Sequence, residues 1–266
     1  MSTTWTAYTR ARRRSRQAWT ILVMAAVLVV SGVGWFFTTG QFDAAGSATG
    51  GPTEAPVLNP DFMKPINGVP KVAPGRALDA LAKLDVKGRA PSSDYDRAAF
   101  GQAWADVDRN GCDTRNDILR RDLSGVQFTE GSLCRVASGD FAEPYTGVAV
   151  SFRRGQETSA AVQIDHVVAL ADAWQKGAQQ LTAQQRQMLA NDPLNLVAAD
   201  GPANQKKGAG DAATWLPANK NFRCHYVARQ ISVKSAYKLW VTAAEKEAMG
   251  RVLASCPGQE TIYNSR

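Results

Sequence analysis

The hydrophobic pattern begins with a long uncharged run near the start of the chain, followed after residue 75 by shorter apolar segments. Residues 18–37, AWTILVMAAVLVVSGVGWFF, contain no charged side chain. A helix rises about 1.5 Å per residue, so twenty residues cross a hydrocarbon core of about 30 Å. We therefore expect one transmembrane helix over 18–37. A signal peptide cleaved near residue 45 is the alternative, because the residues there are small.

Charge gives this segment a direction. Five arginines precede it with no acid among them: Arg10, Arg12, Arg13, Arg14 and Arg16. The positive-inside rule places the basic residues 1–17 in the cytoplasm and everything after Phe37 outside. Both interpretations export the remaining chain, as the extracytoplasmic domain of a cell-membrane protein or as a secreted protein.

Residues 38–75 are rich in glycine, proline, serine, threonine and alanine, and they show no apolar periodicity. This composition predicts a flexible linker or stalk. One globular domain is expected over 76–266. Its first helix is predicted over 76–84, where leucines recur at three-residue steps, and a second around 95–104.

The middle of the domain alternates strand and helix signals. The segments 147–153 (GVAVSFR) and 161–168 (AVQIDHVV) are predicted strands, joined through the polar RGQETS as a hairpin-like link. Residues 169–189 are helical in composition, and Asp192-Pro193 ends that pattern. Residues 194–198 (LNLVA) predict a short strand. Asp200-Gly201-Pro202 then predicts an N-cap and first turn of a helix. The result is an α+β fold.

The net charge of +7 comes mainly from the N-terminal arginines, so by itself it is weak evidence for a nucleic-acid partner. Locally, residues 201–238 contain seven lysines and arginines against one acid, interleaved with Trp215, Phe222, Tyr226 and Tyr237. Beside a phosphodiester site this pattern favours a substrate groove, whereas a solvated charged face is the alternative.

The four cysteines form no CxxC pair, which argues against a zinc ribbon. An even number in an exported domain predicts two disulfides, for which three pairings are possible. We expect Cys112–Cys134 and Cys224–Cys256, because each pair joins neighbours within one half of the domain.

The candidate chemistry centres on two adjacent residues, Asp165 and His166, at the end of a predicted strand. Neighbours on a strand point to opposite faces, although at a strand end both can border one site. A carboxylate beside an imidazole suits a hard metal ion and a general base. Asn195 in the next strand could orient that imidazole, and Asn204 could supply a second oxygen ligand to the metal.

Further polar residues surround this set. Lys206 and Lys207 follow Asn204 near a helix N-terminus and are candidates for binding phosphate. The stretch GCDTRNDIL is a dense polar cluster, in which Asp113 is interpreted as a helix cap. Arg115 is a candidate phosphate ligand, because a guanidinium matches phosphate oxygens. His225 is interpreted as structural or surface-exposed.

The runs IDHVVAL, DPLNLVAADGPANQKKG and DAATWLP resemble the HNH (ββα-metal) endonuclease family, in the branch whose last motif residue is asparagine. They are similar to exported bacterial nucleases related to the C-terminal domain of GmrSD restriction enzymes. The resemblance covers about residues 104–256. It departs from many HNH modules in a long insertion between His166 and Asn195, which carries a helix.

The resemblance implies a ββα-metal core with added helices, and it implies roles for the candidates. Asp165 and Asn204 would bind one divalent metal ion, expected to be Mg²⁺, and His166 would be the general base whose ring Asn195 holds. The expected activity is endonucleolytic hydrolysis of DNA, with the choice between DNA and RNA left open, and no protein partner is inferred. The alternative is a catalytically inactive binding module of the cell envelope.

Overall fold

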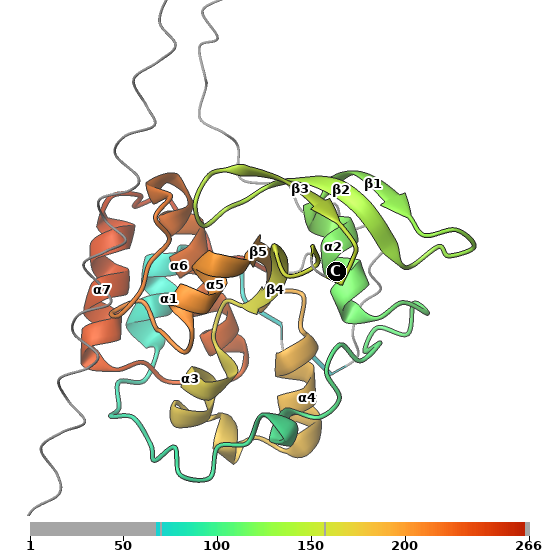
Figure 1. Cartoon of the computed structure of the whole chain (residues 1–266). Helices are drawn as coiled ribbons and strands as arrows, with labels where there is room; N and C mark the ends of the chain where they lie inside the picture. The colour runs from blue at the N-terminus through green and yellow to red at the C-terminus, as the bar shows by residue number, and fades with distance from the viewer. Residues whose placement is uncertain (1–67, 70, 157, 264–266) are drawn as a thin grey trace, which may run out of the picture. The chain divides into compact units, whose positions relative to one another are not determined.

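The structure, a computed structural model, describes residues 68–69, 71–156 and 158–263 (Figure 1). Its α-helices within these ranges are α1 (Ala77–Lys83), α2 (Thr114–Asp122), α3 (Leu170–Gln175), α4 (Ala183–Asn191), α5 (Gly201–Lys207), α6 (Arg223–Ala236) and α7 (Ala243–Ala254). Its strands are β1 (Ser124–Phe128), β2 (Val136–Ala142), β3 (Ala149–Arg153), β4 (Val162–His166) and β5 (Leu196–Asp200). Three short 3₁₀ helices are η1 (Arg97–Phe100), η2 (Ala178–Gln180) and η3 (Lys220–Phe222). The α+β prediction is therefore confirmed.

The strands form two small antiparallel sheets, with orders β1-β2-β3 and β4-β5. The expectation that β3 and β4 form a hairpin-like pair is wrong. Instead, β3 pairs with β2, from Ser138↔Arg153 to Ala142↔Ala149, and β4 pairs with β5. Burial explains the choice: β3 alternates between exposed and buried residues, whereas β4 and β5 are buried along almost their whole length.

Two helix predictions also need correction. Residues 169–189 do not form one helix, because Gly177 adopts φ +119° and Thr182 starts a new helix, α4, with a capping box. The second early helix, expected around 95–104, is reduced to the single turn η1. By contrast, α1 lies within the predicted range, and α4 ends directly before Asp192-Pro193 as expected.

The two-stranded sheet of β4 and β5 lies at the centre of the fold, between two sets of elements (Figure 1). Val162, Ile164, Leu196 and Ala198 on one face pack in a hydrophobic cluster with α2, β2 and β3. The opposite face of β5 contributes Val197 and Ala199 to a second cluster with α1, α6 and α7. Both faces of this two-stranded sheet are therefore covered, and its polar side chains are buried between the sheet and the elements that cover it.

Both predicted disulfides are confirmed. Cys112–Cys134 ties the segment before α2 to the loop between β1 and β2, and Cys224–Cys256 ties the start of α6 to the segment that follows α7. Each closes a short loop of 22 or 32 residues, which stabilises the domain by about 3–4 kcal/mol through restriction of the unfolded chain.

In the described part of the chain, no helix is both long enough and apolar enough to span a bilayer. The predicted transmembrane segment, 18–37, lies outside the described residues, as do the basic N-terminus and most of the predicted linker.

Candidate active site

Two strands and a helix, β4, β5 and α5, bring the predicted site residues together in the expected β-β-α order. Asp200 caps α5 by accepting a hydrogen bond from the Ala203 N–H at 2.9 Å, and Pro202 lies in the first turn. Gly201 is needed because a Cβ there would approach the Ala160 carbonyl oxygen to 2.2 Å. This close contact sets α5 against the start of β4.

Asp165 and His166 point to opposite faces of β4. The pairing with β5 continues without a bulge through Asp165↔Val197 and His166↔Leu196, so the alternation of side chains is kept to the end of the strand. The expectation that both could border one site at the strand end therefore fails, and each has its own environment.

The Asp165 face is closed by charged and polar contacts. Lys207 Nζ donates to Asp165 Oδ1 at 3.0 Å and to the His166 carbonyl oxygen at 2.9 Å, while the Tyr145 hydroxyl donates to Asp165 Oδ2 at 2.6 Å. Burial raises the pKa of Asp165, and the Lys207 and Tyr145 contacts oppose that shift. Lys207, predicted to bind phosphate, is instead fully buried as the counter-ion of Asp165.

Asn204 lies on α5 against the same face of β4, where its amide Nδ2 donates to Gln163 Oε1 at 2.9 Å. Both oxygens of Asp165 are already engaged, and no three His, Cys, Asp or Glu side chains of the described residues are grouped as a ready metal site. In this arrangement, Asp165 and Asn204 do not fit a divalent ion, because the Lys207 ammonium takes the place of a cation at the carboxylate.

The His166 face opens into a pocket of about 260 Å³, lined mainly by residues 97–104 together with Leu170 and Ala190. The imidazole lies nearly parallel to the Trp104 ring, with centroids 6.2 Å apart and an interplanar angle of 18°. Arg97 lines the same pocket, and its charge helps to lower the pKa of His166. The sequence did not indicate Arg97 or Trp104, because nothing local relates residues 97–104 to β4.

The protonation of His166 follows from its contacts. Burial lowers its pKa to about 3, so the ring is neutral at physiological pH. Nε2 lies 2.9 Å from the Ala190 carbonyl oxygen, which can only accept, so we assign the proton to Nε2. Nδ1 is then the atom with a free lone pair.

Asn195 is fully buried, and its side-chain hydrogen bonds go to the backbone and not to the His166 ring. Its Oδ1 accepts from the Val168 N–H at 2.8 Å, and its Nδ2 donates to the carbonyl oxygens of Val168 and Leu189 at 3.3 and 3.2 Å. Asn195 thus fixes the backbone after β4 and the end of α4, where Ala190 receives the histidine bond. The expected direct orientation of the ring is replaced by an indirect one.

Arg115 and Lys206 lie apart from these contacts. Arg115 on α2 donates through Nη2 to the Val162 carbonyl oxygen at 3.2 Å, which supports the first residue of β4. Burial lowers the pKa of this guanidinium. Lys206 on α5 is exposed. Asp113 caps α2 through the Asn116 N–H at 2.9 Å, as predicted.

The basic segment 201–238 has fewer exposed cations than its sequence suggests. Three of its seven cations are buried, namely Lys207, Arg229 and Lys234. Arg229 donates to the backbone carbonyls of Pro193, Leu194 and Leu196, and Lys234 joins a buried ion network. The network has three cations and three carboxylates: Arg89, Lys176, Lys234, Asp172, Asp211 and Glu245.

The aromatic residues of that segment are also mostly internal. Phe222, Tyr226 and Tyr237 are buried in the core, and Trp215 packs edge-on against Tyr145 and Tyr226. His225 contacts Phe222, and burial lowers its pKa to about 4, consistent with the structural interpretation. The predicted substrate groove is therefore wrong for these residues, which serve the core.

Comparison with known proteins places this geometry in a family. The chain is 36% identical over 206 residues to an uncharacterized secreted protein of Arthroderma benhamiae, across 77% of this chain and 92% of that protein. No solved structure matches the chain. The family model of the GmrSD restriction endonuclease C-terminal domain matches residues 113–252. That match covers more than half of the chain and confirms the predicted resemblance, so the chain belongs to the family of the GmrSD restriction endonuclease C-terminal domain.

Proposed function

We infer that this protein is an endonuclease that hydrolyses phosphodiester bonds of DNA or RNA outside the cytoplasm, with His166 as the general base. The observation that carries this inference is the neutral His166 imidazole beside a pocket that Arg97 also lines. Membership of a restriction-endonuclease domain family supports the reaction class.

The proposed base is Nδ1 of His166. With Nε2 donating to the Ala190 carbonyl, Nδ1 can take a proton from a water molecule that attacks phosphorus. A free-state pKa of about 3 makes a weak base, because an efficient base titrates near the working pH. A bound phosphate would raise that pKa, because its negative charge stabilises the imidazolium.

Arg97 is the proposed phosphate-binding residue of this pocket. Its side chain is exposed and cationic, and a guanidinium can donate two parallel hydrogen bonds to phosphate oxygens. Lys206, exposed on α5, and Arg115 remain proposed contacts to more distant phosphates of the strand.

Magnesium, implied by the family resemblance, would polarise the phosphate and stabilise the leaving oxygen. Asp165 and Asn204 would hold it only after the Lys207 ammonium moved away from the carboxylate. His166, Asn195 and Arg97 act on the opposite face or through the backbone, so the roles proposed for them do not depend on that movement.

The location outside the cytoplasm is supported by two disulfides, which form and persist in oxidising compartments, and by the secreted relative. The chain after residue 37 would reach that compartment through its uncharged N-terminal run, which either anchors it in the membrane or is cleaved.

The test is cleavage of supercoiled plasmid and of a structured RNA by the full chain, purified with both disulfides formed. Reactions with Mg²⁺ are compared with reactions in EDTA. Nicked and linear products support the endonuclease, and their loss in EDTA supports the metal. Binding of DNA or RNA by the folded protein without cleavage under any of these conditions would contradict the proposal and favour an inactive binding module.

A further inference from the structure

The loop that leads into α2 has a spacing of oxygen-bearing side chains that the proposed nuclease reaction does not use. Residues 106–117 read DVDRNGCDTRND. Asp106, Asp108, Asn110 and Asp117 occupy the first, third, fifth and last positions, and Gly111 occupies the sixth. This is the spacing of the twelve-residue calcium loop of EF-hand proteins, with aspartate in place of glutamate at the end.

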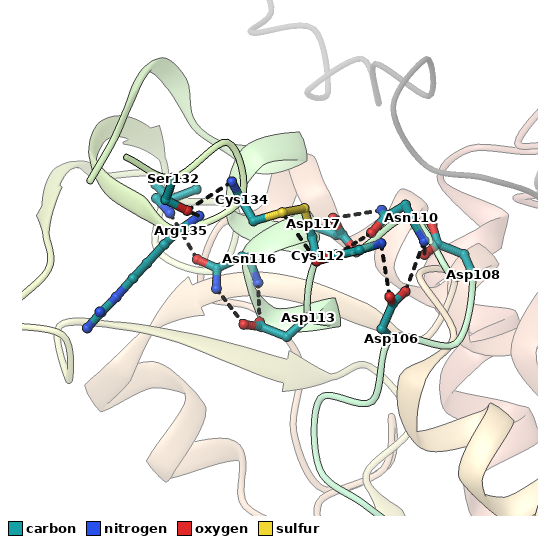
Figure 2. Close-up of a disulfide and its surroundings, with 12 residues drawn as sticks. Asp106, Asp108, Asn110, Cys112, Asp113, Asn116, Asp117, Ser132, Cys134 and Arg135 are labelled. Carbon is teal, nitrogen blue, oxygen red and sulfur yellow. Dashed lines mark hydrogen bonds between the residues drawn. A yellow bond between two sulfur atoms is a disulfide. The ribbon is translucent and has the colours of Figure 1, made fainter. Parts of the chain in front are cut away.

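The same side chains are turned into one loop (Figure 2). Asn110 Nδ2 donates to Asp108 Oδ2 at 3.1 Å and to Asp117 Oδ1 at 3.0 Å, so the amide bridges two carboxylates. Asp106 accepts the backbone N–H groups of Asn110 and Gly111 at 3.1 and 2.9 Å. Gly111 has φ +94°, a conformation that favours glycine and allows the sharp turn.

Asp117 is the most buried carboxylate of this loop. It is only 3% exposed, and its Oδ1 accepts a hydrogen bond from the Asn110 amide. In the part of the chain that the structure describes, no salt bridge joins it to a lysine or arginine.

We propose that residues 106–117 bind a calcium ion through carboxylate oxygens of Asp106, Asp108 and Asp117 and the amide oxygen of Asn110. The carboxylates do not yet converge on one point, since Asp106 and Asp108 accept hydrogen bonds from within the loop. On binding, these oxygens turn from their N–H donors to the ion, and the Cys112 carbonyl, at the seventh position, can add a ligand.

The ion would act on the pocket through the backbone. The Thr114 N–H donates to the Trp104 carbonyl oxygen at 3.3 Å, and Cys112 within the loop is tied to Cys134. Calcium at the loop would therefore fix the segment that carries Trp104. Extracellular calcium modules bind with dissociation constants of about 10⁻⁴–10⁻³ M, which suits an exported protein.

The first experiment measures thermal unfolding of the full chain in EDTA, in CaCl₂ and in MgCl₂. A hundredfold excess of Ca²⁺ over its dissociation constant should raise the midpoint by about 5–10 °C, and Mg²⁺ by clearly less. Terbium provides a second probe, because Trp104 lies two residues from Asp106 and should sensitise Tb³⁺ luminescence that Ca²⁺ then competes away.

Variants locate the ion. Asp106→Asn combined with Asp108→Asn should abolish both the midpoint rise and the terbium signal, whereas Asp140→Asn, an exposed acid on β2, should keep both. Asp165→Asn should also keep the calcium response, which separates this site from any metal in the nuclease reaction. If the double variant does not fold, the wild-type terbium signal and its competition by Ca²⁺ still decide the question.

Asp117→Asn separates binding from a purely structural role. It removes a buried charge without a cation, so in EDTA its midpoint should lie above that of the wild type, and Ca²⁺ should raise it no further. A lower midpoint with a retained calcium response would overturn the proposal. So would the absence of terbium luminescence in the wild type, or an equal rise with Mg²⁺.

Discussion

The two faces of β4 carry adjacent residues into opposite environments. On one face, Asp165 is closed off by the Lys207 ammonium and the Tyr145 hydroxyl. On the other, His166 is neutral and borders a pocket that Arg97 and Trp104 also line. The contacts of the Asp165 face hold the β-β-α unit together, whereas the His166 face carries the proposed chemistry. Each prediction below perturbs one of the two faces or the link between them.

The largest effect is expected from Lys207→Met. It leaves the Asp165 carboxylate buried without a counter-ion, so the free energy of unfolding should fall by about 3–5 kcal/mol. Because protonation of Asp165 removes the unpaired charge, the loss should shrink as the pH falls. Denaturant unfolding at several pH values measures both effects. Adding Asp165→Asn to the variant should recover part of the stability, and equal stability of Lys207→Met and wild type would show that the pair is not structural.

Asn195→Ala should weaken the link between the two faces. It leaves the Val168 N–H and the Leu189 carbonyl without their side-chain partner, at a cost of about 1–3 kcal/mol. Because Ala190 follows Leu189, the histidine should also lose its fixed position, so kcat should fall more than KM changes. Steady-state kinetics below the unfolding midpoint measure this split. An unchanged kcat would restrict Asn195 to a structural role.

Arg97→Ala tests the pocket face alone. Loss of a charge-assisted phosphate contact should lower kcat/KM by about 10–100-fold, while the unfolding midpoint stays within error because Arg97 is exposed. Arg153→Ala, an exposed arginine on β3, is the matched control and should keep full activity. Equal activity of the two variants would remove Arg97 from the site.

The pH dependence of stability spreads its effect over several pH units and tests the burial of His166. The pKa of His166 is lowered to about 3 in the folded protein, below its ordinary value of 6.5, so the unfolded chain binds more protons between these values. Stability should therefore be fully present above pH 6.5 and fall as the pH drops toward 3, by at most about 1.4 kcal/mol per pH unit for this group. His166→Gln should flatten part of that slope, and an unchanged slope would contradict the burial argument.

Local signals made much of the fold predictable. The Asp200 cap with Pro202 placed α5, Asp192-Pro193 placed the end of α4, and the cysteine spacing gave both disulfides. Each of these features is decided by residues close together in sequence. The β-β-α order followed from the same signals and from the family resemblance.

The pairing of charges could not be predicted, because it depends on burial and on contacts far apart in sequence. Lys207 looks like a phosphate ligand in a basic run, yet its partner, Asp165, lies 42 residues earlier. The segment 97–104 reaches His166 because η1 packs beside α3 and α4. Trp104 also has φ +58°, a backbone state that its sequence does not indicate.

The central claim is that His166 is the base, and single-turnover cleavage of DNA by His166→Ala tests it most directly. His225→Ala is the matched control, since His225 is the other histidine and its pKa is also lowered by burial. We predict a rate loss of about 10²–10⁴-fold for His166→Ala with DNA affinity unchanged, and a wild-type rate for His225→Ala. Wild-type cleavage by folded His166→Ala would contradict the account.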